Sequence, residues 1–136
     1  MSKYMDRAKE LRACTSIHYN CAQSVLIPFA ADAGLSEEDA FRMAANFGGG
    51  MLMGGTCGAF TGGMMALGVW GVDDKPVVQE LIRTMKANHD GTLDCAKLLA
   101  KNAELGNPRK PHCDAMVYEA VELVEQILRE LGKISG

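Results

Sequence analysis

Apolar residues recur every three or four positions along most of the chain, with polar residues between them. That spacing places the apolar side chains on one face of a helix, and no segment shows the strict alternation of a half-buried strand. The clearest stripe lies near the C-terminus, where Met116, Ala120, Val124, Ile127 and Leu131 share a face. The pattern predicts helices over residues 3–14, 17–33 or 20–33, 37–47, 75–88, 93–101 and 111–131.

Residues that favour helix ends set these boundaries. Ser36 can cap a helix whose first turn is acidic, and Gly34 suits the stop of the helix before it. Pro28 should kink that preceding helix, whereas Pro76 stands in a first turn, where proline is tolerated. Gly91 ends the helix over residues 75–88.

The thirty residues 43–72 carry no charge and include ten of the fifteen glycines of the chain. Such a segment is long enough to cross a bilayer, but glycine lowers both its hydrophobicity and its helix propensity. We therefore expect a buried central helix from Thr56 onward, after an irregular loop over Gly48–Gly55, and no transmembrane segment. The predicted fold is all-α: a single domain over residues 1–136, with six or seven short helices around this glycine-rich central helix.

Four glycines in this segment, Gly50, Gly54, Gly58 and Gly62, follow one another at four-residue spacing. In a helix that spacing gives a face without side chains, against which another backbone can approach closely. One interpretation is tight packing within the fold. The other is room for a cofactor, with Gly58 and Gly62 as its contacts, or for a partner helix, which would allow a homodimer.

Composition and charge narrow the class of protein. The 136 residues are 48% hydrophobic and 23% charged, which is enough apolar material for one core, and the formal net charge is -3. Because no basic surface is available to neutralise phosphates, nucleic acid is excluded as a partner. Residues 1–12 are rich in charge and lack the apolar stretch of a signal peptide, which predicts a cytoplasmic protein.

The cysteines are the main candidates for chemistry, since cytoplasmic thiols stay reduced and no C-x-x-C signature is present. Four of the five follow residues that can begin a helix: Asn20 before Cys21, with Gln23 completing a capping box, Thr56 before Cys57, Thr92 before Cys95, and Pro111 before Cys113. The N–H groups of a helix start favour thiolate, the form that attacks disulfides or binds metal. Cys14, late in its helix, is interpreted as a core residue.

Two further features receive weaker interpretations. His112 could raise the thiolate fraction of Cys113 or bind a metal, although a solvated helix cap is the more common role. The five methionines between Met43 and Met65 are interpreted as core filling rather than as ligands for a soft metal.

The order of these motifs is informative. Asn20-Cys21-Ala22-Gln23, Phe47-Gly48-Gly49-Gly50, Cys57-Gly58-Ala59-Phe60-Thr61-Gly62, Cys95 and Cys113 together resemble the C-GCAxxG-C-C family of redox-active proteins. The resemblance covers nearly the whole chain and includes the intact C-G-A-x-x-G element. It implies that Cys21, Cys57, Cys95 and Cys113 are the functional cysteines and that Cys14 is additional.

Three functional hypotheses follow. In the first, the four cysteines catalyse thiol/disulfide exchange as a thiol-based oxidoreductase, with a redox partner protein or a small thiol. In the second, the same four bind an iron–sulfur cluster or zinc for electron transfer or metal handling, which a more distant similarity to the iron–sulfur part of split-Soret cytochromes favours. In the third, the chain is a helical structural or interaction domain with core cysteines. The first two require the four sulfurs to converge.

Overall fold

The computed structural model describes residues 2–134 of the chain, and within them the fold is helical. The elements are α1 (Lys3–Ala13), α2 (Cys21–Ala30), a 3₁₀ turn η1 (Ala31–Ala33), α3 (Glu37–Met43), an irregular segment η2 (Gly50–Gly54), α4 (Gly58–Val69), α5 (Lys75–Asn88), α6 (Cys95–Glu104) and α7 (Arg109–Glu130). The described residues contain no strand, only one isolated bridge between Thr56 and Asp94. The all-α prediction, with six or seven helices, is therefore confirmed.

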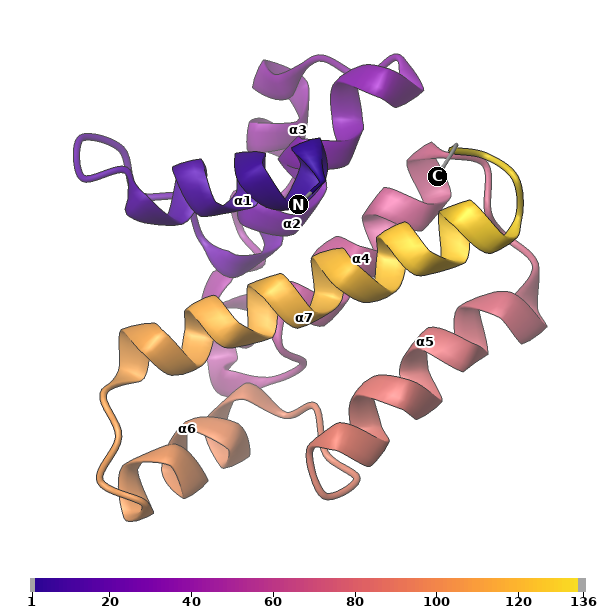
Figure 1. The fold of residues 1–136 in the computed structure, drawn as a ribbon. Helices are drawn as coiled ribbons and strands as arrows, with labels where there is room; N and C mark the ends of the chain where they lie inside the picture. The colour runs from indigo at the N-terminus through magenta and orange to yellow at the C-terminus, as the bar shows by residue number, and fades with distance from the viewer. Residues whose placement is uncertain (1, 135–136) are drawn as a thin grey trace.

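Helices α2 and α4 pack against each other at the centre of the fold, and α7 packs on both. Figure 1 shows α7 as the long helix that crosses the front of the molecule, with α5 and α6 below it. Helix α1 lies against α2 and α7, α3 against α2, and α6 against α7 and η2. The glycine-rich helix α4 thus shares the central position with α2.

Helix α2 is buried because its sequence is apolar on all sides and its ends are satisfied. Its first turn forms a capping box. The Asn20 side-chain oxygen accepts a hydrogen bond from the backbone N–H of Gln23, and the Gln23 side-chain oxygen accepts one from the backbone N–H of Asn20. At the other end, Trp70 Nε1 donates to the Phe29 carbonyl at 2.9 Å. The α-helix ends at Ala30, two residues after Pro28, and Gly34 then adopts the predicted left-handed stop.

Three predicted boundaries shift. The helix predicted over 37–47 ends at Met43, because the carbonyls of Ala44 and Ala45 turn to accept hydrogen bonds from the Asn20 side-chain amide. The helix predicted over 93–101 is α6, two residues later at its start. The last helix begins at Arg109 rather than Pro111, since first-turn N–H groups have no intrahelical acceptor and proline is tolerated throughout that turn.

The glycine-rich segment divides as the sequence predicts. Residues before Thr56 are irregular, and within η2 both Met51 and Leu52 have left-handed backbone angles, with φ of 59° and 62°. The regular helix α4 follows. Within residues 2–134, none of the helices has the length and apolar character needed to span a membrane.

The methionine prediction is wrong for three of the five residues. Met43, Met53 and Met64 are 53%, 75% and 38% exposed, because the segment that carries them lies at the edge of the fold or on the outer face of α4. They do not fill the core.

The glycine face of α4 is used for helix packing. A Cβ on Gly62 would lie 2.6 Å from the Ala22 carbonyl oxygen, and one on Gly58 would lie 3.2 Å from the Ala22 nitrogen. Glycine therefore allows the backbones of α2 and α4 to approach more closely than any side chain would permit. Gly50 and Gly54 do not continue this face, because they precede the helix.

This packing predicts opposite effects for two substitutions in the same helix. Gly62→Ala should lower the free energy of unfolding by about 1–3 kcal/mol, because the methyl group forces α2 and α4 apart. Gly68→Ala should leave stability unchanged or raise it by up to ~1 kcal/mol through helix propensity, since nothing lies within 4 Å of its Cβ position. Urea unfolding followed by circular dichroism measures both; equal stabilities of the two variants would contradict the packing argument.

Candidate functional site

The four cysteines of the predicted set line one small cavity of about 30 Å³. They arrive from different parts of the chain, because Cys21 starts α2, Cys57 precedes α4, Cys95 starts α6 and Cys113 lies in the second turn of α7. Arg109, His112 and Met116 line the same cavity. The fold therefore brings the four residues to one cavity, and all five cysteines are free thiols.

Two backbone hydrogen bonds hold the segments of Cys57 and Cys95 side by side. The Cys57 N–H donates to the Leu93 carbonyl at 2.7 Å, and the Cys95 N–H donates to the Gly55 carbonyl at 2.6 Å. The isolated bridge between Thr56 and Asp94 lies between these two bonds. The two paired segments are far apart in the sequence, and no periodic pattern of residues predicts their pairing.

Glycine backbones complete the approach of the cysteine-bearing segments. A Cβ on Gly58 would lie 3.3 Å from Cys21 Cβ, and a Cβ on Gly50 would lie 2.7 Å from Cys95 Cβ. Side chains at these positions would separate the helix starts that carry the thiols. The glycines thus serve the cysteine cluster as well as the core.

Only one of the four predicted caps is correct in detail. Asn20 caps α2 as expected, but Cys57 is itself the N-cap of α4, and Asp94 rather than Thr92 caps α6. The Thr92 hydroxyl instead accepts a hydrogen bond from the backbone N–H of Asp94. Cys113 is the fifth residue of α7 rather than the third, because that helix begins at Arg109 and not at Pro111.

The expected thiolate character of the helix starts is also wrong for three cysteines. Burial raises the pKa of Cys57 to about 11, although the backbone N–H groups of Ala59 and Phe60 favour its thiolate. The pKa of Cys95 is raised by burial and by the nearby Cys113. The pKa of Cys21 is raised chiefly because its thiol donates a hydrogen bond to Cys113, and burial adds to this. Desolvation of these sulfurs outweighs the helix dipole.

Cys113 is the exception. The hydrogen bond from the Cys21 thiol, with further support from Arg109 and the charge of His112, lowers the pKa of Cys113 to about 6 against the opposing effect of burial. Cys113 therefore carries most of the thiolate at neutral pH. The charge of His112 favours this thiolate, which is the less common of the two roles that the sequence suggests for this histidine. The interaction between Cys21 and Cys113 thus shifts their two pKa values in opposite directions.

Arg109 is a site residue that the sequence interpretation missed. It is four residues before Cys113, a spacing that places both on the same face of a helix. A helix that begins at Pro111, as the sequence pattern predicts, leaves Arg109 outside it and so does not place Arg109 near Cys113. A first turn containing Pro111 at its third position would have revealed it.

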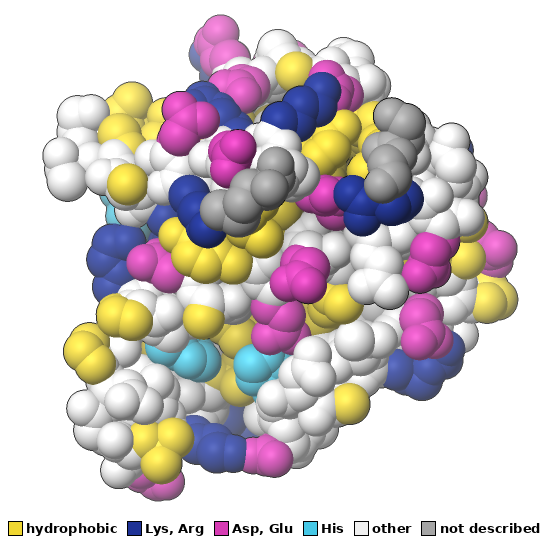
Figure 2. Space-filling view, in the orientation of Figure 1, with side chains coloured by type: hydrophobic (Ala, Val, Ile, Leu, Met, Phe, Trp, Pro, Cys, Tyr) yellow, Lys and Arg dark blue, Asp and Glu magenta, His cyan; other side chains and the backbone are white. Residues whose placement is uncertain are grey.

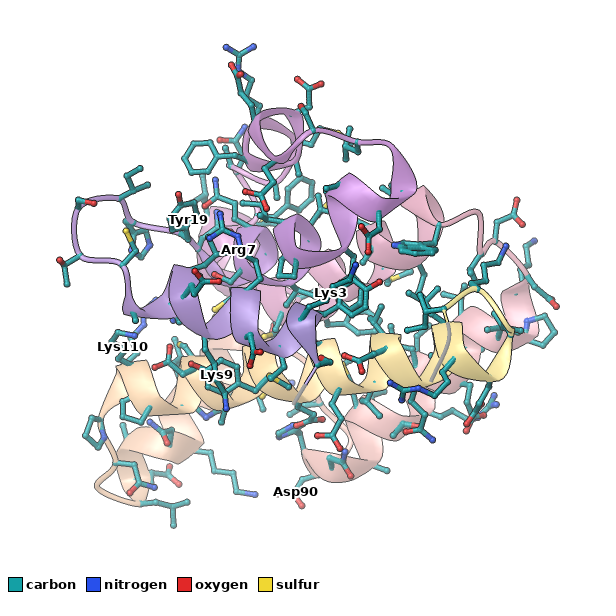
Figure 3. All side chains as sticks on the ribbon, turned by 45° about the horizontal axis from the view of Figure 1, so that its top comes forward. Lys3, Arg7, Lys9, Tyr19, Asp90 and Lys110 are labelled. Carbon is teal, nitrogen blue, oxygen red and sulfur yellow. The ribbon has the colours of Figure 1, made fainter. Side chains whose placement is uncertain are left out.

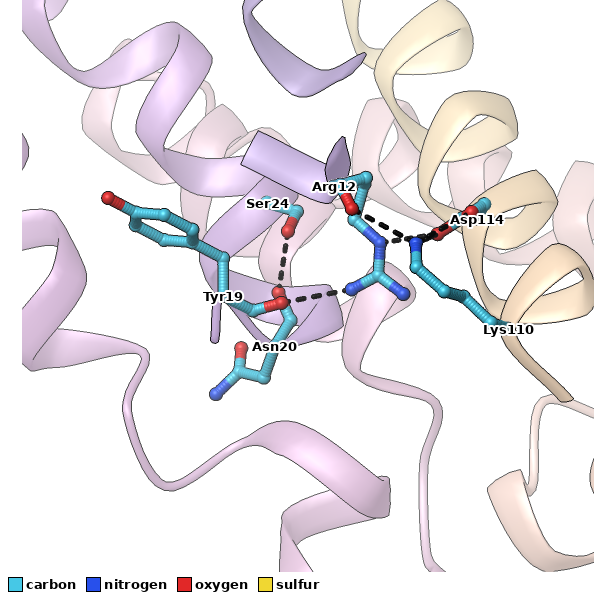
Figure 4. A network of polar contacts seen from close by, with 6 residues as sticks. All are labelled: Arg12, Tyr19, Asn20, Ser24, Lys110 and Asp114. Carbon is cyan, nitrogen blue, oxygen red and sulfur yellow. Dashed lines mark hydrogen bonds and ion pairs between the residues drawn. The ribbon is translucent and has the colours of Figure 1, made fainter. Parts of the chain in front are cut away.

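A larger cleft, of about 670 Å³, opens beside this pair. Cys21 and Cys113 line it together with Arg12, Arg109 and Lys110, whereas Cys57 and Cys95 line only the inner cavity. Figure 4 shows the hydrogen bonds beside this cleft. The Arg12 guanidinium donates to the Asp114 carboxylate at 2.6 Å and to the Tyr19 carbonyl at 3.0 Å. Lys110 bonds the same carboxylate at 3.0 Å.

Cys14 is not the core residue that the sequence predicts. It follows the last residue of α1 and is half-exposed on the rim of the cleft, where a hydrogen bond with Ser16 lowers its pKa. The helix ends before Cys14, so its side chain turns away from the stripe that contains Leu11.

A metal fits the arrangement poorly as it stands. The donor set is suitable, since thiolates and histidine bind zinc and iron–sulfur clusters. However, within residues 2–134 no three His, Cys, Asp or Glu side chains are grouped closely enough to hold a metal ion. The cavity that the four cysteines line is small, about 30 Å³.

A family model matches most of the chain. The family model described as "Putative redox-active protein (C_GCAxxG_C_C)" matches residues 19–127. The chain belongs to the C-GCAxxG-C-C family. No curated protein and no solved structure is similar enough to match it. The matched range includes Cys21, Cys57, Cys95 and Cys113 and leaves out Cys14, as the sequence resemblance implies.

The environment of Cys113 predicts its titration. In a Cys14→Ser background, alkylation of Cys113 by iodoacetamide should rise with pH and reach half its maximum near pH 6, because the thiolate is the reactive form. Arg109→Gln should shift that midpoint upward, while Lys75→Gln, at the start of α5, should not. Peptide mass spectrometry measures the modification; a midpoint near 8.5, the value of an ordinary thiol, would contradict the assignment.

Proposed function

We propose that this member of the C-GCAxxG-C-C family is a thiol–disulfide oxidoreductase in which Cys113 is the attacking thiolate and Cys21 the resolving thiol. The observation that carries the proposal is the position of Cys21 and Cys113, which among the four cavity cysteines are the two that line both the inner cavity and the open cleft. A nucleophile must be both deprotonated and reachable, and among the four cavity cysteines Cys113 combines the two properties.

The exchange proceeds in two balanced steps. Cys113 thiolate attacks one sulfur of a substrate disulfide, which forms a mixed disulfide and releases the other half as a thiolate. The released thiolate takes up a proton, and the Cys21 thiol loses its own proton as it attacks the Cys113 sulfur. The Cys21–Cys113 disulfide forms and the second half of the substrate leaves as a thiol. Two protein thiols are oxidised as one substrate disulfide is reduced, and the reverse direction uses the same groups.

Cys57 and Cys95 suit a different task. They line the inner cavity but not the cleft, and Cys57 is only 6% exposed. A substrate in the cleft would therefore meet Cys21 and Cys113 first. The inner thiols border the Cys21–Cys113 pair from the side of the inner cavity, and they stay reduced while the outer pair reacts.

Trapping the mixed disulfide tests this order. In a Cys14→Ser background, 2-hydroxyethyl disulfide should remove two titratable thiols and form Cys21–Cys113. With Cys21 also replaced by Ser, the reaction should stop at one 2-mercaptoethanol adduct on Cys113, detected by mass spectrometry. Cys113→Ser should react about tenfold or more slowly, because the remaining cavity thiols hold their protons at pH 7.

Two further outcomes decide the pairing. Cys57→Ser should still lose two thiols and form the Cys21–Cys113 disulfide. If Cys57→Ser prevents that disulfide, or if Cys113→Ser reacts at the parent rate, the proposed roles are wrong. Circular dichroism of each variant shows whether the helices are retained.

The second candidate is a four-cysteine iron–sulfur or zinc module, and the convergence of all four cysteines on one cavity favours it. The spacing of the donors and the size of the cavity weigh against it, because a metal site would require the cysteine-bearing segments to move apart and regroup.

Anaerobic purification separates the two candidates. If the dithiol hypothesis holds, the protein should be colourless after anaerobic treatment with iron and sulfide and should hold much less than one zinc ion per chain. A visible charge-transfer absorption that Cys57→Ser abolishes would instead establish the cluster.

A further inference from the structure

The cleft beside the reacting pair has an uneven charge. Three cationic side chains line it, Arg12, Arg109 and Lys110, and none of its lining residues is acidic. Asp114 bonds both Arg12 and Lys110, so this carboxylate and the Cys113 thiolate stand against three positive charges. The chain as a whole has the opposite sign, with a formal net charge of -3. The positive charge is therefore a local property of this cleft.

The cations come from two distant parts of the chain and are held in place. The Arg12 side chain is only 8% exposed, and its bonds to Asp114 and the Tyr19 carbonyl fix the guanidinium at the end of α1. Lys110 also donates to the Arg12 carbonyl at 3.0 Å, which joins the end of α1 to the start of α7. Figure 3 shows Lys110 on the same side of the molecule as Tyr19. In Figure 2, Lys and Arg side chains gather beside an acidic one at the left edge, between these two helices.

Arg109 is the cation closest to the chemistry. It lines both the cleft and the inner cavity and contacts the Cys113 sulfur. Among the described residues no carboxylate forms an ion pair with Arg109, and its partner is the Cys113 sulfur. An anionic group held there would lie within a few atoms of the reacting sulfur.

The remaining wall of the cleft is apolar. Leu11, Ala45 and Leu52 contribute to it, and Leu52 is 73% exposed at the tip of the left-handed turn in η2. The volume, about 670 Å³, lies within the range of small-molecule sites, roughly 300–1,000 Å³. The cleft is thus lined by cations, by aliphatic surface and by the sulfurs of Cys21 and Cys113, with Cys14 also on its wall.

We infer that the cleft binds small anionic disulfides and their thiols, such as carboxylate-bearing ones, with the acidic group on Arg109 and Lys110 and the sulfur against Cys113. This inference rests on the proposed thiol–disulfide function and adds the substrate class. A local positive charge attracts an anion and repels a cation, and electrostatic steering changes association rates by roughly tenfold or more.

Three disulfides that differ chiefly in charge test the inference. Dithiodipropionate is dianionic, 2-hydroxyethyl disulfide is neutral and cystamine is dicationic. The rate at which each oxidises the reduced Cys14→Ser protein at pH 7 is divided by its rate with dithiothreitol, which removes differences in intrinsic reactivity. The normalised rates should follow the order anionic, neutral, cationic, with about tenfold or more between the extremes at low salt and a smaller ratio at high salt.

Charge reversal provides a matched control. Lys110→Glu should reduce the ratio of the anionic to the cationic rate several-fold, because it removes a cation from the cleft and adds an anion. Lys75→Glu makes the same change in net charge at the start of α5, outside the cleft, and should leave the ratio unchanged.

The outcomes distinguish the inference from the proposed function. Equal normalised rates, a preference for cystamine, or equal effects of the two lysine variants would overturn the anionic substrate class and leave the Cys21–Cys113 pair intact. No reaction with any of the three disulfides would overturn the proposed function itself.

Discussion

The close approach of α4 to α2 is the contact on which the site depends. At Gly58 and Gly62 the backbone of α4 lies so near Ala22 that a Cβ would meet carbonyl oxygen or nitrogen. This contact places the start of α4 beside the start of α2, and so Cys57 beside Cys21. Since the two helices also form the centre of the core, the cysteine cluster is built into the packing that stabilises the fold. A change that separates these helices would disturb both.

Within the cluster, burial and charge act against each other, and their balance differs from thiol to thiol. Cys57 has the N–H groups of a helix start beside it, yet desolvation raises its pKa. Cys113 is also partly buried, but a donated hydrogen bond, Arg109 and His112 together outweigh the loss of water. A helix dipole acts through partial charges, whereas Arg109 carries a full one close to the sulfur. The proximity of full charges and donors therefore decides which cysteine ionises.

Sequence alone predicts much of this and fails for definite reasons. The helices, the capping box at Asn20 and the set of four cysteines follow from local patterns and from the family resemblance. The pairing of Thr56 with Asp94, the hydrogen bond between Cys21 and Cys113, and the joining of Arg12 to Lys110 connect residues far apart in the chain, which no local pattern encodes. Arg109 could have been found from its spacing to Cys113, had the proline-containing first turn been included in the helix. Cys14 and the exposed methionines show the remaining error, because apolar character does not fix burial at the edges of elements.

The position of the outer pair links two surfaces that would otherwise be separate. Cys21 and Cys113 line both the cleft and the inner cavity, so a disulfide formed between them faces a substrate on one side and the Cys57 and Cys95 thiols on the other. An inner pair that met substrate directly would need to be exposed, and exposure would remove the desolvation that keeps Cys57 protonated. The outer pair thus differs from the inner pair by its access to the cleft and by the charges around Cys113. The cleft then needs only to select the molecule that reaches Cys113, and its uneven charge gives it a physical means to do so.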